Sequence, residues 1–135
     1  MRVFLDTNVL VSAFASRGLC AEVLELVLLD HDLILGRNVL RELDKALREK
    51  VKVPVVRSAE IVDFVAGEAT RIVDEAEPAI VNVDPADALV LGEALAGQAE
   101  AFVTGDAALL QLAAVGALKI VSPRQFWEVL RAGNG

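Results

Sequence analysis

Cysteine, histidine and tyrosine are nearly absent from this sequence of 135 residues: Cys20 is the only cysteine, His31 is the only histidine, and there is no tyrosine. A single cysteine excludes intrachain disulfides and cysteine-based zinc sites. A single histidine excludes catalysis by a pair of imidazoles. One tryptophan and five phenylalanines are too few for a broad surface on which single-stranded bases stack. The chemistry of this chain must therefore rest on carboxylates.

Long uninterrupted hydrophobic runs are also missing, although 55% of the residues are apolar. Charged residues such as Asp6, Glu22 and Asp30 interrupt every run before it reaches the roughly 18 residues that a membrane helix needs. Asp6 also comes too early for a signal peptide to form before it. We therefore expect a single domain, residues 1–135, with a large core, no membrane contact and a cytoplasmic location.

Positive charge is scarce, with 13 basic against 20 acidic residues and a net charge of -7. This balance disfavours nucleic-acid binding through bulk electrostatics. Residues 37–57 are the exception, because seven basic and three acidic residues give this segment +4 and leave -11 for the rest. We expect Arg41, Lys45 and Arg48 to line a path for a phosphate backbone beside Glu42. A solvated helix face is the alternative interpretation.

Short β-branched runs alternate with longer segments of helical period, which is typical of βαβ units. The predicted strands are residues 2–5, 33–35, 101–103 and 119–121. The predicted helices are residues 9–14, 21–29, a segment that starts after Asn38 and ends before Pro54, 58–71, 85–95, a segment from 107, and 123–130. The sequence therefore predicts an α/β fold, Rossmann-like, with a central and mostly parallel sheet flanked by helices.

Helix starts are marked by capping residues. Asn38 and Ser58 are predicted to cap the third and fourth helices. Asp84 and Ser122 are each followed by proline, which is favoured in the first turn of a helix. The two proline-marked starts are the firmest boundaries in the sequence.

Two aspartates follow predicted strands. Asp6 comes directly after residues 2–5, and Asp106 follows residues 101–103 through Thr104 and Gly105. Adjacent parallel strands would bring both carboxylates to one crevice at the carboxyl edge of the sheet. Each aspartate alone is equally well explained as a helix cap, but the pair favours a functional site.

Two further acids lie on predicted helices. Asp87 is three residues after Asp84, which suits a capped first turn, and Glu42 could pair with Lys45 on a helix surface. A hard divalent cation needs several oxygen ligands in one cleft, which four converging carboxylates would supply. Spacing alone leaves open whether Asp6, Glu42, Asp87 and Asp106 converge.

At these residues the sequence resembles the PIN domain family, in particular the small single-domain bacterial proteins grouped with VapC-like toxins of toxin–antitoxin systems. Five motifs occur in the right order over nearly the whole chain. They are residues 3–13 (VFLDTNVLVSA), 38–43 (NVLREL), 84–87 (DPAD), 102–106 (FVTGD) and 120–126 (IVSPRQF).

The resemblance implies a Rossmann-like sheet and a metal-dependent endoribonuclease whose products carry 5′-phosphate and 3′-hydroxyl ends. It implies one or two Mg²⁺ or Mn²⁺ ions held by four acids, an RNA substrate, a small antitoxin protein as partner and a homodimer. The implied ligands are Asp6, Glu42, Asp87 and Asp106, with Thr7, Asn8, Thr104 and Asp84 in supporting roles. Ala108 stands where relatives often carry another acid, which weakens a second metal site.

Other classes fit the same α/β order less well. A phosphoacceptor receiver domain needs an acidic pair after its first strand, and a haloacid-dehalogenase phosphatase needs a second aspartate where this chain has Asn8. The stronger alternative is a PIN-like domain with weak catalysis that serves as an RNA-binding or protein-interaction module. Cleavage of single-stranded RNA with added metal separates that module from an enzyme.

Overall fold

A single six-stranded sheet forms the centre of the protein, and the computed structural model describes residues 1–133. Its order is β3-β2-β1-β4-β6-β5, and every neighbouring pair is parallel except β5 with β6. The strands are β1 (Arg2–Leu5), β2 (Asp32–Gly36), β3 (Arg71–Val73), β4 (Ala101–Val103), β5 (Ala114–Val115) and β6 (Leu118–Val121). The predicted α/β architecture with a mostly parallel sheet is confirmed.

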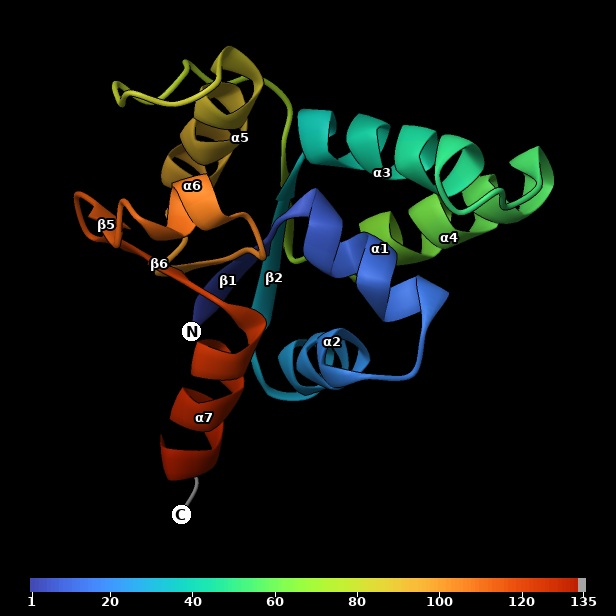
Figure 1. Ribbon diagram of the computed structural model, residues 1–135, viewed down its shortest axis with the longest axis horizontal. Coiled ribbons are helices and arrows are strands. Elements are labelled where there is room, and N and C mark those ends of the chain that lie inside the picture. The colour runs from blue at the N-terminus through green and yellow to red at the C-terminus, as the bar shows by residue number, and fades with distance from the viewer. Residues whose placement is uncertain (134–135) are drawn as a thin grey trace.

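Helices cover both faces of this sheet. They are α1 (Thr7–Ala15), α2 (Leu19–Asp30), α3 (Arg37–Glu49), α4 (Val55–Glu68), α5 (Pro85–Ala96), α6 (Ala107–Leu110) and α7 (Pro123–Gly133). Figure 1 shows α1 to α4 on one side of the sheet and α5 and α6 on the other. Right-handed crossovers explain this division, since the chain moves outward from β1 to β3 and then returns to β4. Helix α7 packs against α2.

Strands β1 and β4, whose carboxyl ends lead into the polar residues Asp6 and Thr104, form part of the buried core. Val3, Phe4 and Leu5 of β1 are completely buried, as are Phe102 and Val103 of β4. The Phe4 and Phe102 rings stack across the two strands with their centroids 5.3 Å apart. None of the helices within residues 1–133 is long and apolar enough to cross a membrane.

The pairing of β1 with β4 sets the positions of the polar residues that follow them. Leu5 lies opposite Val103, so Asp6 and Thr104 leave the sheet side by side. The backbone N–H of Asp6 donates to the carbonyl of Val103 at 2.9 Å, which continues the pairing by one step. The prediction that adjacent parallel strands bring Asp6 and the 104–106 segment to one edge is confirmed.

Two predicted caps are wrong. Helix α3 begins after Gly36, and Asn38 is already inside its first turn, where its backbone and side-chain N–H groups donate to Glu93. Helix α4 begins three residues before Ser58, after Pro54, because proline without a free N–H suits a helix start. Ser58 is instead completely buried and donates to Asp44 of α3 at 2.7 Å.

The segment from Ser58 to Arg71 is also not one helix. Helix α4 ends at Glu68, and residues 71–73 form the edge strand β3, because Ile72 and Val73 pair with β2. Strand β5, of only two residues, was not predicted either. Neither strand is long enough to show a clear alternation of apolar and polar residues.

The bond between Ser58 and Asp44 makes a prediction for acid stability. The Ser58 hydroxyl, with Arg48, lowers the pKa of Asp44 below its ordinary 3.8. A lowered folded-state pKa gives stability that is present above pH 3.8 and is lost as the pH falls through that lower value. Ser58→Ala should therefore lower the melting temperature at neutral pH, and the difference from wild type should shrink below pH 3.8.

Melting curves over the acid range measure this effect. Ser16→Ala is the matched control, because the Ser16 hydroxyl bonds only to the carbonyl of Ser12 and to no carboxylate among the described residues. Its effect on the melting temperature should not vary with pH. A constant difference between wild type and Ser58→Ala through the acid range would contradict the assigned role of Asp44.

Candidate active site

Asp6 occupies the centre of the carboxyl edge. It is only 7% exposed, and its carboxylate accepts hydrogen bonds from Thr7 N at 2.9 Å, Asn8 Nδ2 at 3.1 Å and Thr104 Oγ1 at 2.7 Å. Burial raises the pKa of Asp6, and the charge of Glu42 adds to this effect while the three hydrogen bonds oppose it. Burial at this position therefore disfavours the charged form of the Asp6 carboxyl group.

Thr104 connects β1 to the loop after β4. This residue is completely buried. Its hydroxyl donates to Asp6 and accepts from Asn8 Nδ2 at 3.3 Å and from the backbone N–H of Asp106 at 3.0 Å. Asn8 Oδ1 in turn accepts from Gly105 N at 2.8 Å. Thr104 and Asn8, which were predicted as supporting residues, thus join the two strand ends.

Glu42 comes to the site from α3. Its Oε2 atom accepts a hydrogen bond from the Thr7 hydroxyl at 2.8 Å, and Thr7 also binds Asp6 through its backbone. The predicted surface pair of Glu42 with Lys45 does not occur among the ion pairs of residues 1–133. The Glu42 side chain is therefore held against the first turn of α1 by its bond from Thr7.

Asp106 is both a helix cap and a member of the site. Its Oδ1 atom accepts from the backbone N–H groups of Ala108 at 2.8 Å and Leu109 at 3.3 Å, so it caps α6. The bonds that it makes within the described residues all use Oδ1, so Oδ2 makes none there. The capping interpretation is confirmed at this residue, and its role in a metal site stays a prediction.

Asp87 is the least compensated acid of the site. It lies in the first turn of α5, after the N-cap Asp84, whose carboxylate accepts from Ala86 N at 2.9 Å. Burial raises the pKa of Asp87, and the negative charges of Asp106, Asp6 and Asp84 raise it further. The charges that act on Asp87 are thus all carboxylates, which is the environment that a bound cation would relieve.

The four predicted acids share one edge of the sheet. None of them makes an ion pair among the described residues, and all offer the oxygen atoms that hard divalent cations prefer. As the side chains lie within residues 1–133, no three acidic, histidine or cysteine side chains are gathered tightly enough to hold a metal ion. The donor chemistry of the four side chains fits a divalent cation.

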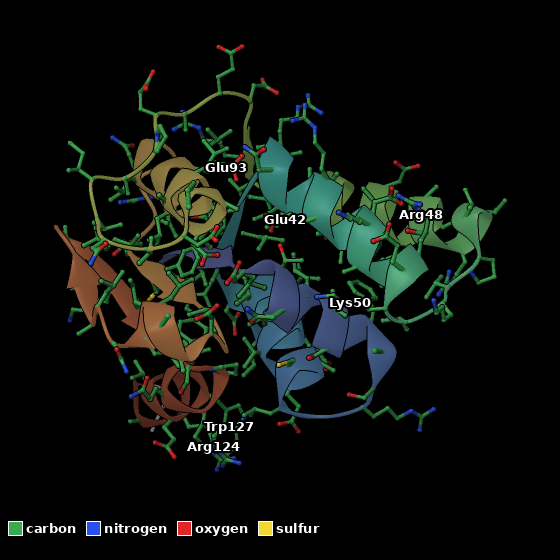
Figure 2. The ribbon with its side chains drawn as sticks, turned by 45° about the horizontal axis from the view of Figure 1, so that its top comes forward. Glu42, Arg48, Lys50, Glu93, Arg124 and Trp127 are labelled. Carbon is green, nitrogen blue, oxygen red and sulfur yellow. The ribbon has the colours of Figure 1, made fainter. Side chains whose placement is uncertain are left out.

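A groove of about 500 Å³ lies between α1 and α3, and of the four acids Glu42 contributes to its lining. Figure 2 shows Glu42 and Lys50 along this side of α3, whereas Arg48 lies on the side toward α4. The lining residues are Thr7, Asn8, Val11, Ser12, Glu42, Lys45, Ala46, Glu49 and Lys50. The groove therefore joins Glu42 and two supporting residues, Thr7 and Asn8, to two exposed lysines.

The three basic residues predicted to line the RNA path lie in different places. Lys45 lines the groove beside Glu42. Arg48 pairs with Asp44 within α3, with 3.1 Å between Nη2 and Oδ2. Arg41 lines another hollow, together with the acidic loop that contains Glu75. Lys50, at the C-cap of α3, also lines the groove, and nothing in the sequence distinguishes it from the other lysines of the basic segment.

The comparisons with known proteins agree with this fold. A family model described as PIN domain matches residues 2–108. A search of curated proteins finds no match. Among solved structures, the chain is similar to VapBC2 from Rickettsia felis bound to a DNA fragment from their promoter, with a TM-score of 0.66 and 18% sequence identity over 90% of this chain and 98% of that one. The resemblance found in the motifs is confirmed, and the chain belongs to the PIN domain family.

Proposed function

We propose that the protein is a metal-dependent endoribonuclease whose Mg²⁺ or Mn²⁺ would be held by Asp6, Glu42, Asp87 and Asp106. The observation that carries the proposal is Asp87, a partly buried carboxylate whose pKa is raised by burial and by three other aspartates. Bound Mg²⁺ or Mn²⁺ would polarise the phosphodiester and acidify a water molecule. PIN domains are generally nucleases, which supports the same assignment.

The other residues of the edge would orient the acids. Thr104 and Asn8 fix the Asp6 carboxylate through Oδ2, and Thr7 fixes Glu42 through Oε2. Each of these donors is itself tied to a neighbouring strand or helix, so the acids enter the reaction already oriented. The preorganised edge would then stabilise charge that develops on the phosphate oxygens.

Chelation tests this proposal. The purified protein should cleave single-stranded RNA with added Mn²⁺ or Mg²⁺ and lose all detectable cleavage in EDTA, because the carboxylates alone repel the phosphate. The measurement is gel analysis of an end-labelled RNA, with end-group analysis for 5′-phosphate and 3′-hydroxyl products. Equal cleavage with EDTA, or none with either metal, would reject the assignment.

The lysines of the groove should bind the RNA backbone. Lys45 and Lys50 are exposed and line the groove next to Glu42, so replacing both with alanine should weaken RNA binding. The slope of log affinity against log salt should fall by at most about 0.7 per lost phosphate contact on a single strand. Binding is measured by fluorescence anisotropy at several salt concentrations in EDTA, which keeps the RNA intact.

Arg48→Ala is the control for this measurement, because Arg48 already pairs with Asp44. It should change the salt slope less than the double lysine variant does. An unchanged slope in the double lysine variant would show that this face of α3 is only solvated.

A partner protein and a homodimer belong to the same proposal. The solved structure similar to this chain is a VapBC complex, which supports a VapC-like toxin with a small antitoxin protein. The alternative is a PIN-like binding module with weak catalysis, which the spacing of the carboxylates favours. RNA binding without metal-dependent cleavage would identify that module.

A further inference from the structure

Glu93 is a charged residue in the middle of an apolar stretch of α5. It is completely buried, and its Oε1 atom makes no hydrogen bond within the described part of the chain. Figure 2 shows it between α5 and the first turn of α3. Burial raises the pKa of Glu93, and the bonds from Asn38 oppose this rise. A buried carboxyl group with one unsatisfied oxygen is costly, so its presence requires an explanation.

The contacts of Glu93 are with the start of α3. Its Oε2 atom accepts from the backbone N–H of Asn38 at 2.9 Å and from Asn38 Nδ2 at 3.2 Å. The first N–H groups of a helix have no partner inside that helix, and the N-cap of α3 is Gly36, which has no side chain to offer. Glu93 therefore caps α3 from another helix.

Gly36 makes room for this contact. A Cβ atom at this position would overlap the Glu93 carboxylate at Cδ, Oε1 and Oε2. The backbone of Gly36 is extended, which any residue can adopt, so space and not conformation selects glycine here. The two residues act together: Gly36 at the N-cap offers no side chain to α3, and the Glu93 carboxylate from α5 supplies the missing capping acceptor.

The capped helix and the capping helix each hold an acid of the active site. Glu42 follows Asn38 by about one turn of α3, and Asp87 precedes Glu93 by less than two turns of α5. We propose that Glu93 is a positioning residue that fixes the start of α3 against α5 and so places Glu42 and Asp87 at the same edge of the sheet. This inference rests on the proposed function only where cleavage is the readout.

Amide hydrogen exchange at Asn38 measures the cap directly. Wild type should protect this amide although it lies in the first turn, and Glu93→Ala should lose that protection while Leu5 in β1 keeps its own. Glu93→Gln should retain it, because the amide oxygen can accept the same two bonds. If Glu93→Ala fails to fold, Gly36→Ala provides the same test, since the new Cβ displaces the carboxylate.

Cleavage kinetics measure the positioning. At saturating Mn²⁺, kcat of Glu93→Ala should fall at least about tenfold with the KM for RNA unchanged, because misplacing Glu42 harms the reaction more than substrate binding. Glu93→Gln should recover most of the loss. Leu130→Ala in α7 is the control for stability alone: it removes a buried side chain, so it should lower the melting temperature without changing kcat.

The outcomes separate this inference from the proposed function. An unprotected Asn38 amide in wild type, a Glu93→Ala variant with wild-type kcat, or a Glu93→Gln variant as impaired as Glu93→Ala would overturn the positioning role. If wild type does not cleave RNA at all, the proposed function fails by itself. The positioning role is then tested by the NMR resonances of Thr7, because the Thr7 hydroxyl donates to Glu42. These resonances should shift in Glu93→Ala but not in Glu93→Gln. Unshifted Thr7 resonances in Glu93→Ala would overturn the positioning role.

Discussion

Asp6→Asn should lower RNA cleavage by about 100-fold or more, since each factor of ten corresponds to about 1.4 kcal/mol of transition-state stabilisation. Asp6 is the most buried of the four acids and receives three hydrogen bonds, so its charge is better placed than any other to act on the reaction centre. Asparagine has almost the same shape and an oxygen that can still accept from Thr7 N. The fold should therefore remain while the charge is lost.

The measurement is single-turnover cleavage at saturating Mn²⁺, with the melting temperature recorded for each variant. Asp63→Asn is the matched control, because Asp63 is exposed on α4 away from the sheet edge and the change in charge is the same. It should leave cleavage at the wild-type rate. Full activity of Asp6→Asn would remove the carboxylates of this edge from the mechanism.

Gly92→Ala should destabilise the protein by about 1–3 kcal/mol, although alanine is normally the better residue inside a helix. A Cβ at Gly92 would overlap the backbone carbonyl oxygen of Glu77. Backbone atoms cannot rotate aside as a flexible side chain can, so the loop before Asp84 would have to move. That loop leads directly into the first turn of α5, and RNA cleavage should fall with stability.

Gly67→Ala is the control for this prediction. Gly67 lies in α4, and a Cβ there would meet no atom within 4 Å. This variant should gain about 0.4–1 kcal/mol, because alanine loses less backbone freedom on folding than glycine does. Chemical denaturation of both variants gives the two free energies of unfolding. A Gly92→Ala variant as stable as Gly67→Ala would contradict the close contact with Glu77.

The parts of the fold that the sequence predicts well are those with strong local signals. The proline-marked starts at Pro85 and Pro123 are both found. The side chains of Ser122 and Gln125 each accept from the backbone N–H of the other residue, as in a capping box. The buried strands β1 and β4 are also found where their apolar runs occur. In these segments local preference and tertiary packing favour the same structure.

The wrong caps show where local preference is overridden. Asn38 and Ser58 are good capping residues by type, yet each uses its polar atoms on a different helix, Asn38 on Glu93 and Ser58 on Asp44. These contacts join residues 55 and 14 positions apart, which no local pattern reveals. The single glutamate within the apolar run of α5 was the one visible signal of the first contact.

The candidate site was predictable as a set of residue types but not as a geometry. Sequence spacing placed Asp6 and Asp106 at strand ends, which the parallel pairing of β1 with β4 confirms. It offered helix capping as a competing interpretation, and Asp106 does cap α6. One carboxylate oxygen of Asp106 suffices for the cap, so the second is available to a cation. Capping and metal binding are therefore compatible at this residue.

The bond from Thr104 to Asp6 has a consequence for when the proposed site is assembled during synthesis. The two residues are 98 positions apart, so a growing chain contains Asp6, Glu42 and Asp87 long before Thr104 leaves the ribosome. Until β4 pairs with β1, the Asp6 carboxylate has only the bonds from its neighbours Thr7 and Asn8 and lacks the bond from Thr104. Domains generally fold as units once their last essential segment is available. The proposed site thus reaches its full arrangement only after β4 and Thr104 have been made.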